Sequence, residues 1–235
     1  MELFFTENYT QGQQRISLSI EESRHIRKVL RKRTEEIVEV TDGKGNHILA
    51  SLESAQNRQV QLAIQETKKI PFPIQNDIEL GISIIRPNRM DWVIEKATEL
   101  GIKTIVPLYC QNSIFRNLKL DHLKRIAISA LKQSRQLFLP EIISPLSLFD
   151  WIESIDMERS NRFIAIPESK GAWAVQSSYT DLKKHHLLIG PEGGFHADEM
   201  IKAEKHNFQS LHLGSTILRT ETAAIAGIVF IKSRI

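Results

Sequence analysis

Two glycine-rich segments in the C-terminal part of the chain carry the residues best suited to ligand binding. The first is Ile189-Gly190-Pro191-Glu192-Gly193-Gly194, and the second runs from Leu213 to Thr222. Glycines let the backbone approach a ligand closely and adopt positive φ angles, while Pro191 keeps Gly190 extended. Neither segment is a Walker A motif or a dinucleotide fingerprint, because the Gly-Lys-Ser/Thr and Gly-x-Gly-x-x-Gly patterns are missing. We therefore expect a ligand site of another kind.

Two charged residues follow the second glycine segment. Arg219 and Glu221 precede the stretch 223–231, which is apolar on every side and therefore predicts a buried helix. Charged side chains rarely lie beside such a helix unless they are paired or functional. We interpret them as functional. The structural alternative is an Arg–Glu pair that caps the helix. For the hydroxyls of Thr220 and Thr222, we expect a role as helix cap.

A basic cluster lies near the N-terminus. Between residues 24 and 33 the chain carries Arg24, His25, Arg27, Lys28, Arg31, Lys32 and Arg33. Such a cluster is suited to neutralising phosphates, and the alternative is a solvated helix face. The net charge of +3 is only weakly informative about nucleic acid.

The first 70 residues predict a small, largely β domain. Strands are expected over 15–20, 37–41, 47–52 and 60–65, with a basic helix over 21–30. Asp42-Gly43-Lys44-Gly45 is a hairpin signal. Pro71-Phe72-Pro73 then predicts a linker, which divides the chain into domains 1–70 and 74–235.

The second domain alternates strands and helices, which predicts an α/β fold with a mostly parallel sheet covered on both faces. Strands are expected over 78–85, 104–108, 163–166, 186–189 and 211–213, and helices over 90–100, 120–137 and 223–231. Ligands bind beyond the carboxyl ends of such strands. The two glycine segments follow consecutive strands, which we expect to be neighbours in the sheet. Asp198 and Glu199 are interpreted as favourable charges at a helix start.

The composition excludes several classes of protein. Of 235 residues, 41% are hydrophobic and 25% are charged, which is typical of a folded globular chain. The single cysteine, Cys110, excludes a disulfide framework and a multi-cysteine zinc site, and no metal is expected. Residues 1–10 do not form a signal peptide, and the apolar run 223–231 is shorter than the ~20 residues of a membrane span. We therefore expect a cytoplasmic protein with no membrane partner.

The two glycine segments resemble the paired signatures of one family. Gly190-Pro191-Glu192-Gly193-Gly194, together with Leu213-Gly214 and the stretch 217–223, is similar to the bacterial uridine-N3 methyltransferases of small-subunit (16S) ribosomal RNA, in the SPOUT (trefoil-knot) superfamily. Collinear matches are His25 with Val29-Leu30-Arg31, Asp42-Gly43, residues 89–101, Gln133-Ser134 and Pro140-Glu141-Ile142. The chain departs from the family at Gln111-Asn112-Ser113, where only Ser113 is carried over, at Arg135-Gln136 and near Glu35.

The resemblance implies a fold, a cofactor and partners. It implies a SPOUT trefoil-knot domain that binds S-adenosyl-L-methionine, a PUA-like N-terminal β-barrel that binds RNA, and a homodimer. The residues implied to bind the cofactor are Pro167, Ile189, Gly190, Glu192, Gly193, Gly194, Leu213, Gly214, Ile217 and Leu218. The residues implied to contact RNA are His25, Arg27, Arg31, Arg33, Arg89 and Ser113.

Methylation of uracil N3 requires an aligned methyl donor and loss of the N3 proton. Arg219 is the expected catalytic residue, because a guanidinium stabilises negative charge on the uracil oxygens, and Glu221 would orient it or accept a proton. N3 lies on the pairing edge of the base, so the target uridine must be unpaired or flipped out. Two alternatives remain: a knotted methyltransferase that acts on another RNA site, and a non-catalytic RNA-binding assembly factor.

Overall fold

The computed structural model describes residues 2–30, 34–54, 58–167 and 184–234. The chain divides into two compact units, one of Met1–Phe72 with Ile128–Leu139 and one of Pro73–Ala127 with Pro140–Ile235. The segment Ile128–Leu139 thus groups with the first unit although most of the sequence around it belongs to the second. Among the described residues, no helix combines the length and the apolar character needed to cross a membrane.

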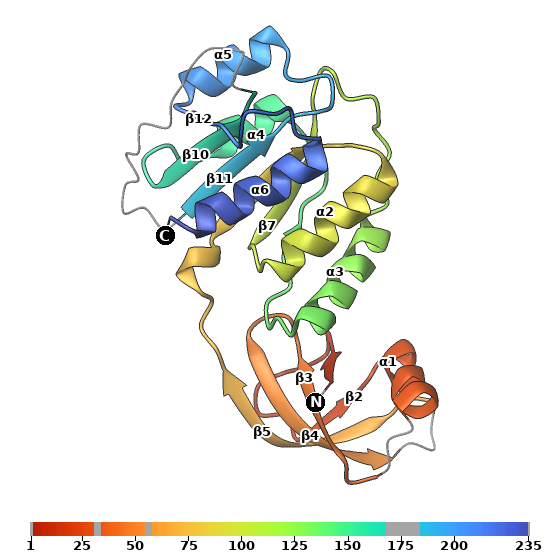
Figure 1. Ribbon diagram of the computed structural model, residues 1–235. Coiled ribbons are helices and arrows are strands. Elements are labelled where there is room, and N and C mark those ends of the chain that lie inside the picture. The colour runs from red at the N-terminus through yellow and green to blue at the C-terminus, as the bar shows by residue number, and fades with distance from the viewer. Residues whose placement is uncertain (1, 31–33, 55–57, 168–183, 235) are drawn as a thin grey trace. The chain divides into compact units, whose positions relative to one another are not determined.

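The first unit is built on a five-stranded sheet (Figure 1). Its strands follow the order β1 (Leu3–Phe5), β3 (Ile37–Thr41), β4 (Asn46–Ser54), β5 (Gln61–Lys69) and β2 (Arg15–Ser17). The pairs are antiparallel except for β1 with β3. Alternate side chains of these strands form one apolar core, since successive residues of a strand point to opposite faces.

The turn between β3 and β4 is the expected hairpin. Gly43 and Gly45 have φ angles of +70° and +89°, which favour glycine, and Asp42 Oδ1 accepts a hydrogen bond from the backbone N–H of Lys44. The expected helix over 21–30 is present in two parts, α1 (Ile20–Arg24) and a π-helical segment, η1 (His25–Leu30).

The helix α3 (Leu120–Ser134) ends earlier than the expected residue 137. Arg135 has a φ of +58°, and this left-handed conformation stops the helix. The end of α3 is fixed within the first unit by two ion pairs. Lys132 pairs with the buried carboxylate of Glu22, and Arg135 Nη2 lies 2.6 Å from Glu39 Oε2.

The second unit contains a seven-stranded sheet, which is parallel as expected and has two short strands more than the five expected. Along the sheet lie β12 (Gln209–Leu211), β10 (Ser160–Ala165), β11 (Lys184–Ile189), β6 (Ile78–Ser83), β7 (Thr104–Tyr109) and β8 (Glu141–Ile142), and β9 (Leu146–Ser147) also pairs with β7. Every pair is parallel. The strand expected over 211–213 lies at 209–211, because pairing with β10 ends at Leu211 and the chain then turns into a loop.

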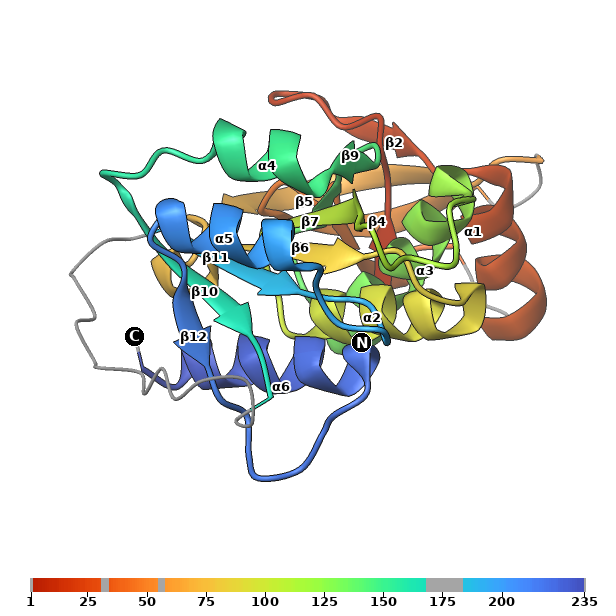
Figure 2. The same ribbon diagram turned by 90° about the horizontal axis from the view of Figure 1, so that it is seen from above.

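Helices cover both faces of this sheet, as Figure 2 shows. One face carries α2 (Pro87–Glu99) and α6 (Thr220–Lys232), and the other carries α4 (Leu148–Ser154) and α5 (Ala197–Lys205). A short 3-10 helix, η2 (Ile74–Asn76), precedes β6. A Cβ on Gly227 of α6 would lie 2.8 Å from Leu187 Cδ2 of β11, so this glycine lets α6 pack closely on the sheet.

The expectation that α6 is buried on every side is wrong. Its buried residues are Thr220, Ala224, Gly227, Ile228 and Ile231, which form the face toward the sheet. Val229, on another face, is 48% exposed. Within this chain the sheet covers only one side of the helix, so an apolar surface remains open.

A partly buried carboxylate lies at the other end of the strands from the glycine segments. Glu79 of β6 accepts a hydrogen bond of 2.7 Å from Trp151 Nε1, and its oxygens lie 3.3 Å from His186 Nδ1 and 3.3 Å from Lys184 Nζ. Burial raises the pKa of Glu79, but the contacts with His186, Trp151 and Lys184 outweigh it and lower the pKa to about 2. The ionised carboxylate therefore stabilises the second unit.

This depressed pKa predicts an acid-dependent loss of stability. Glu79 contributes stability above the ordinary carboxyl pKa of 4.5, and the contribution is lost as the pH falls toward the folded-state pKa of about 2. Glu79→Gln is therefore expected to lower the free energy of unfolding at pH 7 by roughly 1–3 kcal/mol and to flatten its decline below pH 5. Urea unfolding from pH 7 to pH 3, with the exposed Glu141→Gln as control, measures both effects. Parallel pH curves for wild type and Glu79→Gln would contradict the assignment.

Candidate functional site

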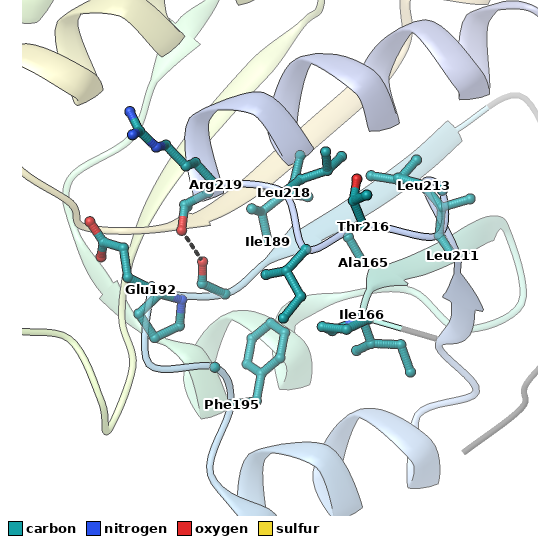
Figure 3. A pocket seen from close by; sticks show the side chains of 18 of the residues that line it. Ala165, Ile166, Ile189, Glu192, Phe195, Leu211, Leu213, Thr216, Leu218 and Arg219 are labelled. Carbon is teal, nitrogen blue, oxygen red and sulfur yellow. Dashed lines mark hydrogen bonds between the residues drawn. The ribbon is translucent and has the colours of Figure 1, made fainter. Parts of the chain in front are cut away.

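A cavity of about 330 Å³ lies where β10, β11 and β12 end (Figure 3). Much of its wall is apolar, with the side chains of Ile189, Leu213 and Leu218 around it. The residues implied by the resemblance that line it are Pro167, Ile189, Gly190, Glu192, Gly194, Leu213, Gly214, Ile217 and Leu218. The two glycine segments therefore meet at one site.

The three loops of the cavity follow the order of the strands in the sheet. Because β10 lies between β12 and β11, the glycine segments belong to strands that are not neighbours, contrary to the sequence expectation. The end of β10, with Ile166 and Pro167, fills the place between them. In a parallel sheet all three loops leave at the same edge, which explains why distant segments share one cavity.

Sequence reasoning missed several lining residues. Ala165 and Leu211 are directly paired across β10 and β12, so their common position follows from a strand register that local patterns do not reveal. Phe195 and Met200 line the cavity from the segment after the first glycine loop and from α5. The position of Phe195 directly after Gly194 in the sequence could have identified it as a lining residue.

The glycines of the two loops have different structural roles. Gly194 and Gly214 have φ angles of +73° and +126°, which other residues rarely adopt. Gly190 does not have a positive φ. A Cβ there would lie 2.9 Å from the Phe195 ring, so the absence of a side chain at Gly190 leaves space for Phe195. Gly193 does not line the cavity, and a Cβ there would lie 3.4 Å from Asn112 Cβ.

The start of α6 is bound to the first glycine loop. The buried Thr220 donates a hydrogen bond of 3.0 Å from Oγ1 to the carbonyl oxygen of Gly190. Neither Thr220 nor Thr222 is the helix cap, since Arg219 occupies the N-cap position and makes no side-chain capping bond. The Thr220 hydroxyl links helix and loop instead.

Arg219 lies at the edge of the cavity. It lines the cavity, but Figure 3 shows its guanidinium turned away from the apolar side chains. In the part of the chain that the structure describes, its side chain has no hydrogen-bonding or ionic partner. The guanidinium is exposed and remains available to a ligand.

Glu221 pairs with another arginine. Its Oε1 lies 3.5 Å from Arg89 Nε, and Arg89 Nη1 lies 3.2 Å from Glu192 Oε1. The structural alternative, an ion pair between Arg219 and Glu221 that caps the helix, is therefore not what the structure shows. Arg89, which the resemblance assigned to RNA, joins two carboxylates beside the cavity.

The loop after β7 is fixed against the first glycine loop. Asn112 Nδ2 donates a hydrogen bond of 3.0 Å to the Gly194 carbonyl, and the Gln111 N–H donates one of 2.8 Å to Glu199 Oε1. Glu199 also belongs to a capping box at the start of α5, which confirms its interpretation as a helix-end charge. Ser113 is buried and 2.8 Å from Ser83 Oγ, so its hydroxyl is engaged inside the protein.

The residues of the basic cluster belong to the first unit. His25 Nε2 lies 3.0 Å from Glu2 Oε1. Arg27 donates hydrogen bonds to the carbonyl oxygens of Ser23 and Arg58, at 3.2 Å and 3.0 Å. Arg31 and Arg33 lie outside the described residues.

Cysteine chemistry does not suit this site. Burial and the charge of Glu199 raise the pKa of Cys110 to about 12, so its thiol stays protonated at neutral pH. Within the described residues, no three His, Cys, Asp or Glu side chains are placed to hold a metal ion.

The backbone of Gly214 predicts a difference between two alanine variants. Gly214→Ala meets no atom within 4 Å, so its cost is the strain of a φ near +126°, about 1–3 kcal/mol of unfolding free energy. Gly193→Ala lacks that strain and is expected to cost less than about 1 kcal/mol. Denaturant unfolding of the two variants measures the difference, and equal losses would contradict the role assigned to Gly214.

Comparisons with known proteins agree along the chain. Residues 72–232 match the family model of an RNA methyltransferase domain, and residues 19–65 match that of an RNA methyltransferase PUA domain. A ribosomal RNA small subunit methyltransferase E from Buchnera aphidicola subsp. Acyrthosiphon pisum is 31% identical, in an alignment that covers 92% of this chain and 87% of the relative.

Two solved structures share the whole fold. A probable rRNA-methyltransferase from Porphyromonas gingivalis has a TM-score of 0.90 and 29% identity, covering 99% of this chain and 98% of its own. A ribosomal RNA small subunit methyltransferase E from Neisseria gonorrhoeae, bound to S-adenosyl methionine, has a TM-score of 0.89 and 27% identity, covering 100% and 98%. The expected fold class, a SPOUT domain with a PUA-like domain, is confirmed. The chain belongs to the family of RNA methyltransferases in which a PUA domain precedes the methyltransferase domain.

Proposed function

We propose that this protein uses S-adenosyl-L-methionine to methylate N3 of one uridine in the 16S ribosomal RNA of the small subunit. The observation that carries the proposal is the cavity formed by the loops after β10, β11 and β12, in a fold shared with the S-adenosyl methionine-bound relative from Neisseria gonorrhoeae. The names of the relatives supply the class of RNA.

The residues of the cavity fit such a cofactor. The volume of the cavity, about 330 Å³, lies at the lower end of the range for small-molecule sites, which span roughly 300–1,000 Å³. Apolar side chains such as Ile189 and Leu218 suit a flat ring, and the glycine loops present backbone groups for hydrogen bonds. Pro167, Gly190, Gly194, Leu213 and Gly214 would hold the cofactor together with these two.

The bound cofactor supplies an electrophilic methyl group, and the protein must orient the uracil and favour loss of its N3 proton. Arg219 is suited to the second task, because its guanidinium is exposed beside the cavity and no described residue engages it. A guanidinium offers forked hydrogen bonds to oxygens on which negative charge develops. Glu221 is paired with Arg89, which favours an orienting role over proton transfer.

We propose that the first unit holds the RNA backbone. The basic cluster with His25, Arg27, Arg31 and Arg33 belongs to the matched PUA domain and would contact phosphates. The target uridine would enter the site unpaired, because its N3 is otherwise engaged in a base pair. Ribosomal RNA as substrate also favours a cytoplasmic location.

A homodimer is part of the proposal. The side of α6 that does not face the sheet is apolar, and Val229 is 48% exposed there. A second copy of the chain would cover this surface through a symmetric contact. Sedimentation of the purified protein at micromolar concentration tests the assembly.

Two measurements test the reaction and its alternatives. Calorimetric titration with S-adenosylmethionine is expected to give micromolar or tighter binding, whereas a non-catalytic assembly factor would not bind it. Mass spectrometry of RNA from a deletion strain is expected to show loss of one methyl group at a 16S uridine N3. Loss at a transfer RNA or a ribose hydroxyl would favour a methyltransferase acting on another RNA site.

Arg219 provides a catalytic prediction. Arg219→Ala is expected to lose nearly all single-turnover methylation with cofactor binding largely kept, and Arg219→Lys to lose much of the rate, because lysine keeps the charge without the fork. The melting temperature of each variant is measured beside the rate. A structural role predicts instead a lower melting temperature with an unchanged rate per folded molecule.

A further inference from the structure

Arg89 joins three elements around the cofactor cavity. It lies in the first turn of α2, Glu192 lies in the loop after β11, and Glu221 lies in the first turn of α6. The guanidinium reaches both carboxylates, at 3.2 Å from Glu192 Oε1 and 3.5 Å from Glu221 Oε1. The Arg89 side chain is 26% exposed, so it is directed mainly at these partners rather than at solvent.

The charge balance of this cluster makes the two carboxylates depend on Arg89. One positive and two negative side chains leave an excess of one negative charge. Glu221 is only 13% exposed, and its Oε2 is buried with no hydrogen-bond partner among the described residues. Without Arg89, both carboxylates would lose the cation that they share, and their like charges would repel each other.

The loop after β11 and helix α6 are also linked by the hydrogen bond from Thr220 to the Gly190 carbonyl. The loop that lines the cavity is therefore attached to α6 twice, once through its backbone and once through Arg89. Glu192 itself lines the cavity, so a displaced Glu192 would change the wall that faces a ligand.

We propose that Arg89 is a positioning residue for the cofactor site, and not an RNA contact as the resemblance implied. By holding Glu192 and Glu221 together, it keeps the first glycine loop closed against the start of α6 and sets the shape of the cavity. The inference rests on the proposed function, since it assumes that the cavity takes S-adenosylmethionine.

The test compares two arginines at the start of the same helix. Arg89→Ala is expected to weaken the affinity for S-adenosylmethionine by at least about tenfold in calorimetry, with RNA affinity and its salt dependence unchanged. Arg86→Ala is the control, because Arg86 is exposed, lies over the Phe115 ring and makes no ion pair with either carboxylate within the described residues. It is expected to leave the cofactor affinity unchanged. Arg89→Lys should be intermediate, since lysine lacks the fork that spans two carboxylates.

A rescue experiment separates positioning from a general loss of stability. In the Arg89→Ala background, Glu192→Gln removes one of the two repelling charges and is expected to restore part of the cofactor affinity, with Glu192→Gln alone as the reference because Glu192 lines the cavity. A purely structural defect would not be relieved by removing a carboxylate from a half-exposed loop.

The outcomes distinguish this inference from the proposed function. If wild type does not bind S-adenosylmethionine, the proposed function fails. If wild type binds and Arg89→Ala binds equally well, or if Arg89→Ala mainly reduces RNA affinity and its salt dependence, the positioning role is overturned. Absence of rescue by Glu192→Gln would also count against it.

Discussion

The common direction of the strands in the second unit is the constraint on which the site depends. Because all the strands of this sheet are parallel, the chain leaves β10, β11 and β12 at one edge. The loops that follow converge there although they come from distant parts of the sequence. A single antiparallel strand among these three would send its loop to the opposite edge and remove one wall of the cavity.

Convergence alone does not fix the loops, and polar contacts complete the arrangement. Thr220 and Arg89 connect the loop after β11 to α6, and Asn112 connects it to the loop after β7. Each contact joins elements far apart in sequence and contributes modestly by itself. Together they hold a glycine-rich loop, which has a high conformational entropy when free, in one conformation before a ligand arrives.

The sequence predicted the parts of the site whose signals are local. Glycines after an apolar run identified both loops, and alternating strands and helices predicted the parallel sheet. The position of β10 between the glycine-bearing strands depends on strand order, which local patterns do not encode. The pairing of Arg89 with Glu221 depends on tertiary packing for the same reason. The short helix α4 was missed, although Ser147 accepts a capping bond from the Asp150 N–H, because seven residues show too little periodicity.

The close packing of Gly227 against Leu187 has a consequence for how the protein tolerates mutation. Gly227 lies two turns along α6 from Thr220, a separation of roughly 10 Å at 1.5 Å per residue. A larger side chain at 227 forces either the Leu187 side chain to move or α6 to rise from the sheet, and a rigid helix carries the second kind of displacement to its first turn. Substitutions in the core beneath α6 can therefore change the geometry of the cavity through the position of the helix. We therefore expect inactivating substitutions in the buried contact between α6 and the sheet as well as among the residues that touch the ligand.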